Sequence, residues 1–208
     1  MPRGKSTASI PPFPDSIDRN HFGSWLSGLI DGEGSFGLQL PPNRKGAAGG
    51  GSPRAFLQIN LRDDDAPVLS LVQQYWRCGT FSVQKRCEQM NKPHPCLMYR
   101  VVGIRELKAI ILPHFDRFPL LAKKKRDLAI WREGVELIAT VACRRRQGGR
   151  GRWGVRQKWT PREIAHFLAL RQALADQRQY QAPPPVVPVA PQHNSQLQLW
   201  PAGGQRSV

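Results

Sequence analysis

The chain has 208 residues, which is enough for one ordinary domain with short tails and for a core that needs no disulfide or structural metal. Lysine and arginine number 31 against 15 acidic residues, so the formal net charge is +16 at pH 7. No apolar run reaches the ~18 residues of a membrane span and no secretory signal is recognisable, so we expect no membrane partner. The basic residues are clustered, which favours a nucleic-acid partner over a surface that only keeps the protein soluble.

The cysteines and the composition indicate a compartment. The four cysteines form no Cys-x-x-Cys pair, which indicates free thiols in a reducing environment. Arginine, alanine, glycine and proline, whose codons are GC-rich, are plentiful. We therefore expect a cytoplasmic, nucleoid-associated bacterial protein, with an organellar matrix or stroma as the alternative.

Helical and strand patterns alternate along the chain. Asp18 is placed to cap a first helix, and Gly34 is placed to end it. After this first helix, the predicted elements are strands over 35–40 and 56–62, a helix over 65–77, strands over 80–86 and 97–102, a helix near 107–115 and a long helix over 121–140. The expected order is α-β-β-α-β-β-α-α, with no visible internal repeat.

The composition divides the chain into four regions. We expect a flexible N-terminal segment at 1–16, a domain at 17–140, a basic Arg/Gly/Trp linker with a C-terminal helix at 141–180, and a Pro-rich disordered tail at 181–208. Thr160-Pro161-Arg162-Glu163 predicts that the C-terminal helix starts with a capping box. This helix has an apolar face, which suits either a brace on the core or an extension of a DNA footprint.

The predicted strands present one apolar and one polar face. The residues expected in the core are Phe36, Leu38, Leu57, Ile59, Leu61, Phe81 and Val83. The residues expected on the opposite face are Ser35, Gln39, Gln58, Asn60, Arg62, Thr80, Ser82, Gln84, Arg86 and Arg100. Amides and guanidinium groups pair with base edges in the major groove. An ordinary solvated sheet face, the alternative, would mix in acidic residues, which are absent from this set.

Residues 26–34 read Leu-Ser-Gly-Leu-Ile-Asp-Gly-Glu-Gly and resemble the LAGLIDADG signature, with six of nine positions identical. The three departures are Ser27, Gly32 and Glu33, which replace small residues by small ones and an acid by an acid. The chain is thus similar to single-motif, homodimeric LAGLIDADG homing endonucleases. The resemblance implies an α+β fold, α-β-β-α-β-β-α, with a saddle-shaped antiparallel sheet that reads double-stranded DNA.

The spacing of the motif also predicts how two chains meet. Gly28 and Gly32 are four residues apart, so they lie on one helix face and allow another helix to approach closely. Because the motif occurs once, the partner helix would come from a second copy in a two-fold dimer. Leu29 would share this interface, and the resemblance gives Asp31 the role of capping the partner helix.

The same helix end predicts a metal site. Glu33 lies where free carbonyls and the negative end of the helix dipole gather. Two such ends side by side would repel each other unless hard cations were bound between them. The resemblance implies Mg²⁺, or Mn²⁺, held by Glu33 and the Gly32 carbonyl and used to hydrolyse phosphodiester bonds.

Further residues carry over from the resemblance. Gln58 matches a glutamine that flanks the active site, although it could equally be another base-reading amide. Lys123 is the lysine expected near the scissile phosphate, where it would stabilise developing charge. Lys124 and Lys125 are expected to hold the DNA backbone or simply to face solvent. Arg144 and Arg145, at the start of a basic stretch without acids, are further candidates for phosphate contact.

These observations predict a site-specific, metal-dependent DNA endonuclease that cuts both strands of a long, near-palindromic target. No intein signature flanks the motif, so we expect an intron-encoded protein of the mobile-intron type. The alternatives are an intron RNA maturase and a non-catalytic DNA-binding protein of the same fold. The presence of Glu33 favours cleavage.

Overall fold

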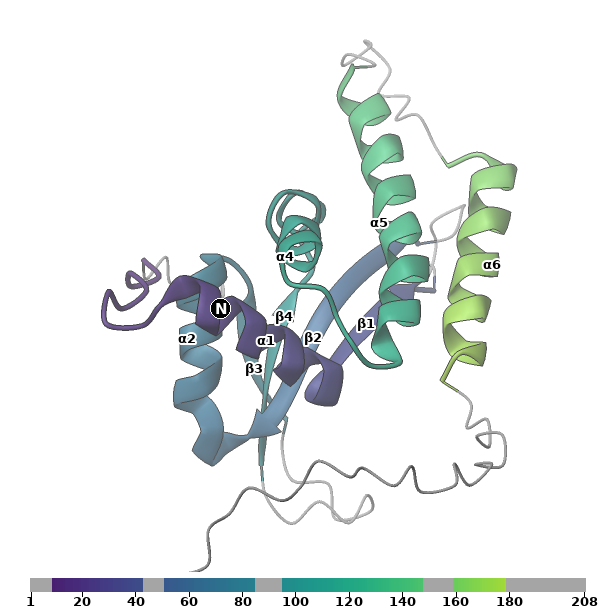
Figure 1. Cartoon of the computed structure of the whole chain (residues 1–208). Helices are drawn as coiled ribbons and strands as arrows, with labels where there is room; N and C mark the ends of the chain where they lie inside the picture. The colour runs from purple at the N-terminus through teal and green to yellow at the C-terminus, as the bar shows by residue number, and fades with distance from the viewer. Residues whose placement is uncertain (1–8, 43–50, 85–94, 148–158, 179–208) are drawn as a thin grey trace, which may run out of the picture. The chain divides into compact units, whose positions relative to one another are not determined.

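The computed structural model describes residues 9–42, 51–84, 95–147 and 159–178, all within one compact unit that ends at Arg178. The elements are α1 (Arg19–Glu33), β1 (Gly34–Gln39), β2 (Arg54–Arg62), η1 (Asp63–Asp65), α2 (Ala66–Trp76), β3 (Thr80–Gln84), β4 (Cys96–Val101), α3 (Ile104–Glu106), η3 (Leu107–Ile111), α4 (Leu112–Arg117), α5 (Lys124–Gln147) and α6 (Pro161–Asp176). The predicted order of helices and strands is confirmed, with η1 and the composite α3-η3-α4 segment as local detail (Figure 1).

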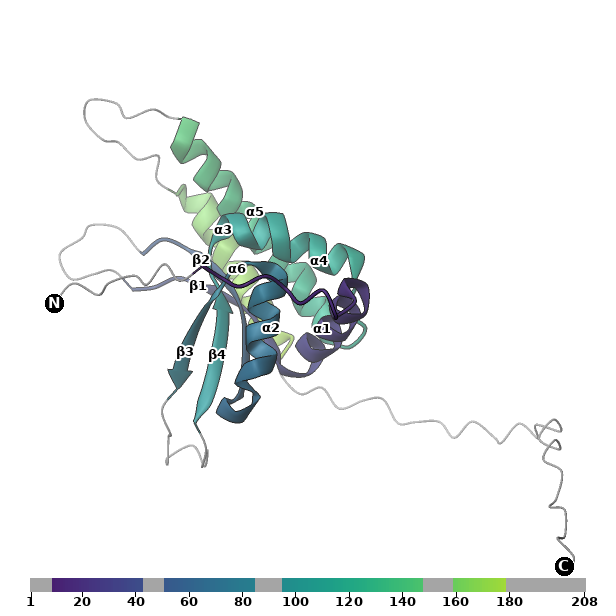
Figure 2. The same cartoon turned by 90° about the vertical axis from the view of Figure 1, so that its left-hand side faces the viewer.

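The four strands form one antiparallel sheet in the order β1-β2-β4-β3. The helices gather on one side of this sheet, as the view in Figure 2 shows. Helix α1 leads directly into β1, and α5 and α6 both contact β1. One face of the sheet is therefore buried under helices, and Gln58, Asn60 and Arg100 lie on the other face.

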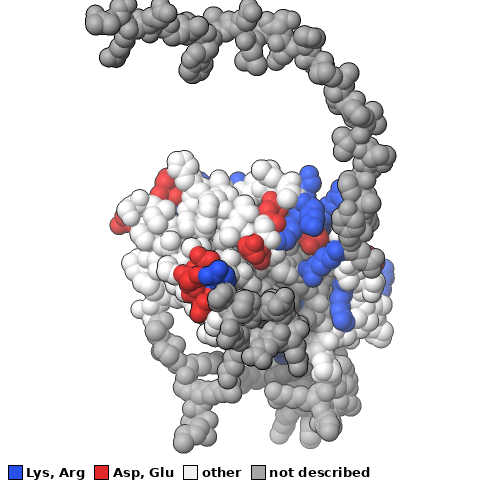
Figure 3. Space-filling model, turned by 90° about the horizontal axis from the view of Figure 1, so that it is seen from below, with Lys and Arg blue, Asp and Glu red and all other residues white. Residues whose placement is uncertain are grey.

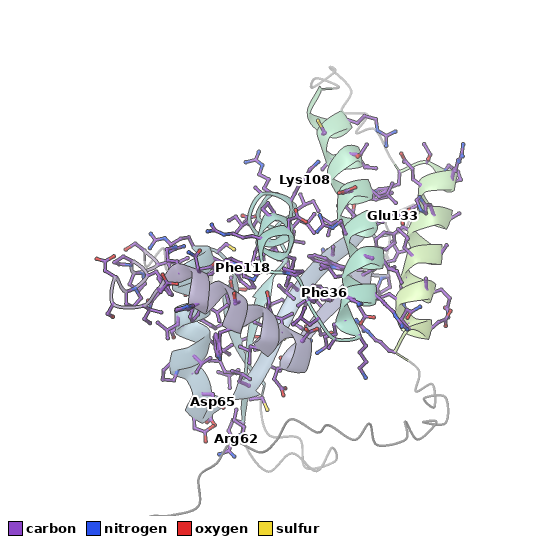
Figure 4. All side chains as sticks on the ribbon, in the orientation of Figure 1. Phe36, Arg62, Asp65, Lys108, Phe118 and Glu133 are labelled. Atoms are coloured by element: carbon purple, nitrogen blue, oxygen red, sulfur yellow. The ribbon has the colours of Figure 1, made fainter. Side chains whose placement is uncertain are left out.

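The core lies between the sheet and the helices. Phe36 of β1 is fully buried, with ring contacts to Phe115 of α4 and Trp131 of α5 (Figure 4). Leu26 and Ile30 bury the inner face of α1. The helix α5 comes close to β1 at Gly134, where an added Cβ would lie 2.7 Å from Leu38 Cδ2. This contact fixes the long helix against the strand that leaves the motif.

The expected core face of the sheet is confirmed for four residues and wrong for two. Phe36, Leu38, Leu57 and Ile59 are buried, and Leu61 is half-buried. Phe81 and Val83 of β3 are instead exposed, at 37% and 66%. The period of two places them on the helix side, but β3 is the outer strand of the sheet, and burial there falls off. The alternating pattern predicted which face of the sheet these side chains point toward, but it did not predict whether helices bury them.

Two of the expected region boundaries need correction. Phe13, within the supposedly flexible 1–16 segment, is buried and packs edge-on against Phe22 and Tyr75 at ring distances of 5.0 and 5.5 Å. Helix α5 continues through the boundary expected at 140, to Gln147. The predictions for 1–8, 148–158 and 181–208 lie outside the described residues.

Helix α6 belongs to the core. It begins with the predicted capping box, in which Thr160 and Glu163 bond each other's backbone N–H groups. Its inner residues Phe167, Leu170 and Leu174 are buried in the core cluster. The helix is therefore a structural part of the domain.

Within the described part of the chain, no helix is long and apolar enough to cross a membrane.

A buried histidine joins α1 to α4. The Ser27 hydroxyl donates its proton to the Phe118 carbonyl at 2.7 Å, so it can only accept from His114 Nε2, 3.2 Å away. Burial lowers the pKa of His114 from 6.5 to about 4, because a charged imidazole would lose its hydration. The histidine is therefore neutral at pH 7 and belongs to the packing.

Acid should destabilise the protein through His114. Below pH 6.5 the unfolded chain binds a proton at this residue, whereas the folded chain does so only near pH 4. We expect the free energy of unfolding to fall by about 2 kcal/mol between pH 7.5 and pH 5 from this group alone. Urea unfolding at both pH values measures the difference. His114→Gln should flatten the dependence, whereas the control His21→Gln, at a side chain that is 95% exposed, should leave it unchanged. Equal slopes in both variants would contradict the assignment.

Candidate active site and nucleic-acid interface

The carboxyl end of α1 places Glu33 at the start of the sheet. Glu33 is the last helical residue and is exposed, and Gly34 begins β1 with its N–H still bonded to the Ile30 carbonyl. A Cβ on Gly34 would lie 2.6 Å from the Ile30 side chain, so glycine is what allows the chain to turn so closely. A carboxylate and the last helix carbonyls are thus presented at the edge of the polar sheet face.

Two contacts fix this helix end to the beginning of α5. Asp31 Oδ2 accepts the backbone N–H groups of Leu121 at 2.8 Å and Ala122 at 3.0 Å. Lys124 Nζ donates to the carbonyls of Ile30 at 3.1 Å and Gly32 at 2.6 Å. A carboxylate on free N–H groups and an ammonium at a helix carboxyl end are both favourable.

The intrachain role of Asp31 was not expected from the sequence, which gave this residue a place in the dimer interface. Its second oxygen, Oδ1, is buried and has no hydrogen bond among the described residues. A contact of Asp31 with a partner helix stays a prediction.

The lysine that lies at the helix end is Lys124, whereas the sequence reasoning chose Lys123. Burial lowers the pKa of Lys124, and the nearby carboxylates of Glu33, Asp31 and Asp127 oppose that shift. Lys123 is exposed and lines a neighbouring hollow of about 200 Å³. The structure therefore places Lys124 at the end of α1, and the approach of Lys123 to a scissile phosphate stays a prediction.

This hollow is strongly basic. It is bounded by Gly34 and Ser35 of β1, the two lysines, Asp127, Gln177 and Arg178. Figure 3 shows Lys and Arg side chains gathered on the side of α5 and α6, with a few acidic side chains among them. Such a cluster of cations beside Glu33 suits the negative charge of a phosphodiester.

The donors present fit half of a metal site. One chain offers the Glu33 carboxylate and the Gly32 carbonyl, which are the oxygen ligands that Mg²⁺ and Mn²⁺ prefer. The Lys124 ammonium on the Gly32 carbonyl shows that this oxygen attracts a cation. Among the described residues, no three His, Cys, Asp or Glu side chains come together around one point.

The sheet register aligns the polar residues in rows. Ser35 pairs with Gln58, Gln58 with Arg100, and Arg100 with Thr80, so one row crosses all four strands. Asn60 and Ser82 stand in the next row, on either side of Met98. Because Ser35 is two residues after Glu33, the first row begins at the helix end. Gln58 therefore lies beside the candidate active site, as the resemblance implied.

An aromatic residue that the sequence reasoning missed organises this face. Phe56 has the same parity as Gln58, yet it is buried because its ring lies over Gly37, where any Cβ would collide with it. The Arg100 guanidinium stacks on that ring at 3.7 Å and donates to Gln39 Oε1 at 3.4 Å. Burial, and the charge of Arg54, lower the pKa of Arg100. Gly37, which pairs with Phe56 across the two strands, is the sequence feature that could have indicated this burial.

Three other predicted DNA contacts are qualified by the structure. Arg62 forms an ion pair with Asp64, so its charge is partly used. Arg144 pairs with Glu163 at the start of α6, so it links two helices, and its contact with DNA phosphate stays a prediction. Lys125 is exposed, and its DNA contact stays a prediction. The side chains of Gln84 and Arg145, and all of Arg86, lie outside the described residues.

The outer face of α1 is free of contacts within the described chain. A Cβ on Gly28 or Gly32 would meet no atom within 4 Å. Trp25, on the same face, is 47% exposed, and Leu121, beside the helix end, is 84% exposed. Leu29 is half-buried. Small residues next to exposed apolar ones form a surface that suits a second helix.

An α-β-β-α-β-β-α unit with a carboxylate at the first helix end and a sheet face of amides and arginines is the fold of the LAGLIDADG homing endonucleases. The family profile described as LAGLIDADG endonuclease matches residues 26–135, which is more than half of the chain. The chain belongs to this family.

Curated relatives of this chain are much longer than the region they share with it. A Neurospora crassa protein named "Probable intron-encoded endonuclease 3" is 31% identical over 120 residues, covering 57% of this chain and 21% of that protein. "Probable intron-encoded endonuclease 2" of the same organism is 32% identical over 116 residues, covering 55% and 24%. The chain thus spans less than a quarter of the length of these curated relatives.

Solved structures show the same fold at low identity. I-SmaMI bound to an uncleaved DNA target in the presence of calcium ions matches with a TM-score of 0.57 at 21% identity, over 77% of this chain and 45% of that chain. The I-LtrWI LAGLIDADG homing endonuclease bound to target DNA matches with a TM-score of 0.57 at 17% identity, over 78% and 46%. This chain therefore corresponds to a little under half of each.

Lys124 should contribute to stability where Lys123 does not. Lys124→Met removes the ammonium from two helix carbonyls, and we expect it to lower the free energy of unfolding by about 1–2 kcal/mol. Lys123→Met should change it by less than about 0.5 kcal/mol, because that side chain is exposed. Urea unfolding at pH 7.5 measures both, and equal losses would show that the contacts of Lys124 contribute nothing specific.

The open space around Gly28 makes a sharp test of the interface. Gly28→Leu should leave the monomer as stable or slightly more stable, because nothing is displaced and leucine favours helix by up to about 1 kcal/mol. We expect it nevertheless to abolish dimers in sedimentation velocity experiments. The control Ala129→Leu changes an exposed residue of α5 and should leave the oligomeric state unchanged. A Gly28→Leu protein that still forms dimers would contradict the proposed packing.

Proposed function

We propose that the protein is a divalent-metal-dependent DNA endonuclease that acts as a homodimer on a long, near-palindromic target. The observation that carries the proposal is the position of Glu33 at a helix end that Asp31 and Lys124 anchor, directly beside the row of Ser35, Gln58, Arg100 and Thr80. Acid, cations and base-reading side chains thus share one edge. The net charge of +16 supports a nucleic-acid substrate.

Several observations support two copies. The chain aligns with slightly less than half of the solved structures it resembles. One chain presents half of an oxygen ligand set, and the outer face of α1 is open and partly apolar. A two-fold pair through α1 would bring two Glu33 carboxylates together, one for each DNA strand.

Each group then has a distinct part in the reaction. Glu33 and the Gly32 carbonyl would hold Mg²⁺ or Mn²⁺, which supplies an activated water and neutralises charge on the phosphate when bound. Lys124 keeps the helix end in place and offers a positive charge to the scissile phosphate. Gln58 and Ser35 are placed to orient groups beside it, and Asn60, Thr80, Ser82 and Arg100 are placed to contact base edges.

The names of the Neurospora crassa relatives support an intron-encoded origin for the present chain. An intron RNA maturase would share the fold and the charge. The presence of the Glu33 carboxylate at the exposed end of α1 favours cleavage over that role.

Replacing the acid should separate binding from cleavage. On DNA selected from a randomised library with Mg²⁺, we expect Glu33→Gln to retain affinity within a few-fold and to lose cleavage by at least about 100-fold, because the carboxylate acts in the transition state. Glu136→Gln makes the same change in charge at an exposed position of α5 and should cut normally. Cleavage at the wild-type rate by Glu33→Gln would overturn the proposed site. Binding without cleavage by the wild type would favour the maturase or a DNA-binding regulator.

A further inference from the structure

Helix α6 lies outside the residues matched by the family, yet it forms one wall of a groove on the polar side of the sheet. The groove has a volume of about 540 Å³. Gly37, Gln39 and Phe56 line it from the sheet, and Leu168, Arg171 and Arg178 line it from α6. These three sheet residues have the parity of the polar row, whereas Leu38, which also lines the groove, has the opposite parity. The groove therefore lies at the β1 edge of the sheet and adjoins the polar face.

The two sides of α6 have different tasks. Its inner side holds the helix in place, through buried Phe167 and Leu170 and through His166, which contacts Glu133 of α5 at 2.8 Å (Figure 4). The side that lines the groove repeats at helical spacing, as Leu168, Arg171 with Gln172, Ala175 and Arg178. Packing therefore accounts for the inner side and leaves the groove side unexplained.

The charge of the groove side points to an anion. Arg171 is exposed and forms no hydrogen bond or ion pair within the described part of the chain. Arg178 donates to the Phe36 carbonyl and pairs with Asp127 at 3.6 Å, so it fixes the end of the helix beside the active site. Two acids contact residues of this side: Asp127 pairs with Arg178, and Asp176 accepts a hydrogen bond from Gln172. The groove itself has no acidic residue in its lining.

The spacing of the two arginines suits a DNA strand. Seven residues separate Arg171 from Arg178, which is about 10 Å at 1.5 Å per helical residue. One DNA strand advances about 3.4 Å per phosphate along the duplex axis, so Arg171 is placed to reach a phosphate about three nucleotides beyond the hollow that Arg178 lines. Arg178 also lines the hollow that contains Lys123 and Lys124, so basic groups continue from the active site along α6.

We propose that the groove between α6 and β1 binds the sugar-phosphate backbone of the DNA flanking the cleavage centre, with Arg171 as its principal phosphate contact. The appended helix is thus both a brace and an extension of the DNA footprint. This inference rests on the proposed function, because it assumes that the polar sheet face lies against DNA. The contact is independent of base sequence and adds affinity without adding specificity.

The salt dependence of DNA binding by the full chain tests the groove. Fluorescence anisotropy with a labelled duplex of about 30 base pairs of arbitrary sequence, over roughly 50 to 300 mM NaCl and without divalent metal, gives the number of phosphate contacts. We expect Arg171→Gln to weaken binding several-fold and to reduce the slope of log K against log salt by about 0.9. Arg162→Gln removes the same charge from an exposed site on the same helix, off the groove, and should leave the slope unchanged.

A second pair of variants guards against local effects at Arg171. Ala175→Glu puts an acid into the groove lining and should weaken binding, whereas Ala169→Glu, on an exposed position outside the lining, should have a smaller effect. Equal effects within both pairs would overturn the groove proposal, and so would a loss seen with duplex RNA but absent with duplex DNA. If the wild type binds no DNA at all, the proposed function itself fails. If the wild type binds and cleaves DNA but Arg171→Gln does not change the salt slope, only the groove proposal fails and the proposed function stands.

Discussion

Two oppositely charged side chains attach the carboxyl end of α1 to the start of α5, one from each helix. The rest of the site depends on that attachment. Asp31 accepts hydrogen bonds from the N–H groups that precede α5, and Lys124 of α5 donates hydrogen bonds to the carbonyls of α1. Each contact satisfies groups that a helix end leaves open. Together they fix the direction in which Glu33 leaves the helix and β1 begins.

Two surfaces meet at this helix end, the outer face of α1 and the polar face of the sheet. The outer face of α1 keeps glycines and an exposed tryptophan clear of the described chain, which leaves room for a second helix. The strand β1 carries the polar row away from the helix end, and α5 is pressed against it where Gly134 meets Leu38. A shift of α1 would therefore move Glu33, the proposed dimer interface and the polar sheet face together.

Local signals predicted much of this architecture, because they depend on neighbours in sequence. The Asp18 cap, the capping box at Thr160 and the alternation in β1 and β2 all appear as expected. The motif likewise located the helix end and Glu33. The failures involve partners that are distant along the chain. The basic stretch around Arg144 did not predict its ion pair with Glu163, which lies on another helix. Phe13 was assigned to a flexible segment because its aromatic partners are on α1 and α2.

The choice between adjacent lysines shows the same limit at finer scale. Lys123 and Lys124 cannot be distinguished by residue type. The rotation of α5 relative to α1 decides which of them reaches the carbonyls at the end of α1. The burial of Phe56 similarly depends on a glycine across the strand pair. Such details depend on packing, which a single sequence specifies only indirectly.

In the proposed dimer, each copy supplies one Glu33 carboxylate to one DNA strand across a shared α1 interface. The most direct measurement is the product made by an isolated mixed dimer, with one wild-type chain and one Glu33→Gln chain carrying different affinity tags, on a supercoiled plasmid containing the selected target. We expect nicked circles, because one strand loses its acid while the other keeps it. Linear plasmid formed at the wild-type rate would show that a single Glu33 serves both strands, which is incompatible with one acid per strand.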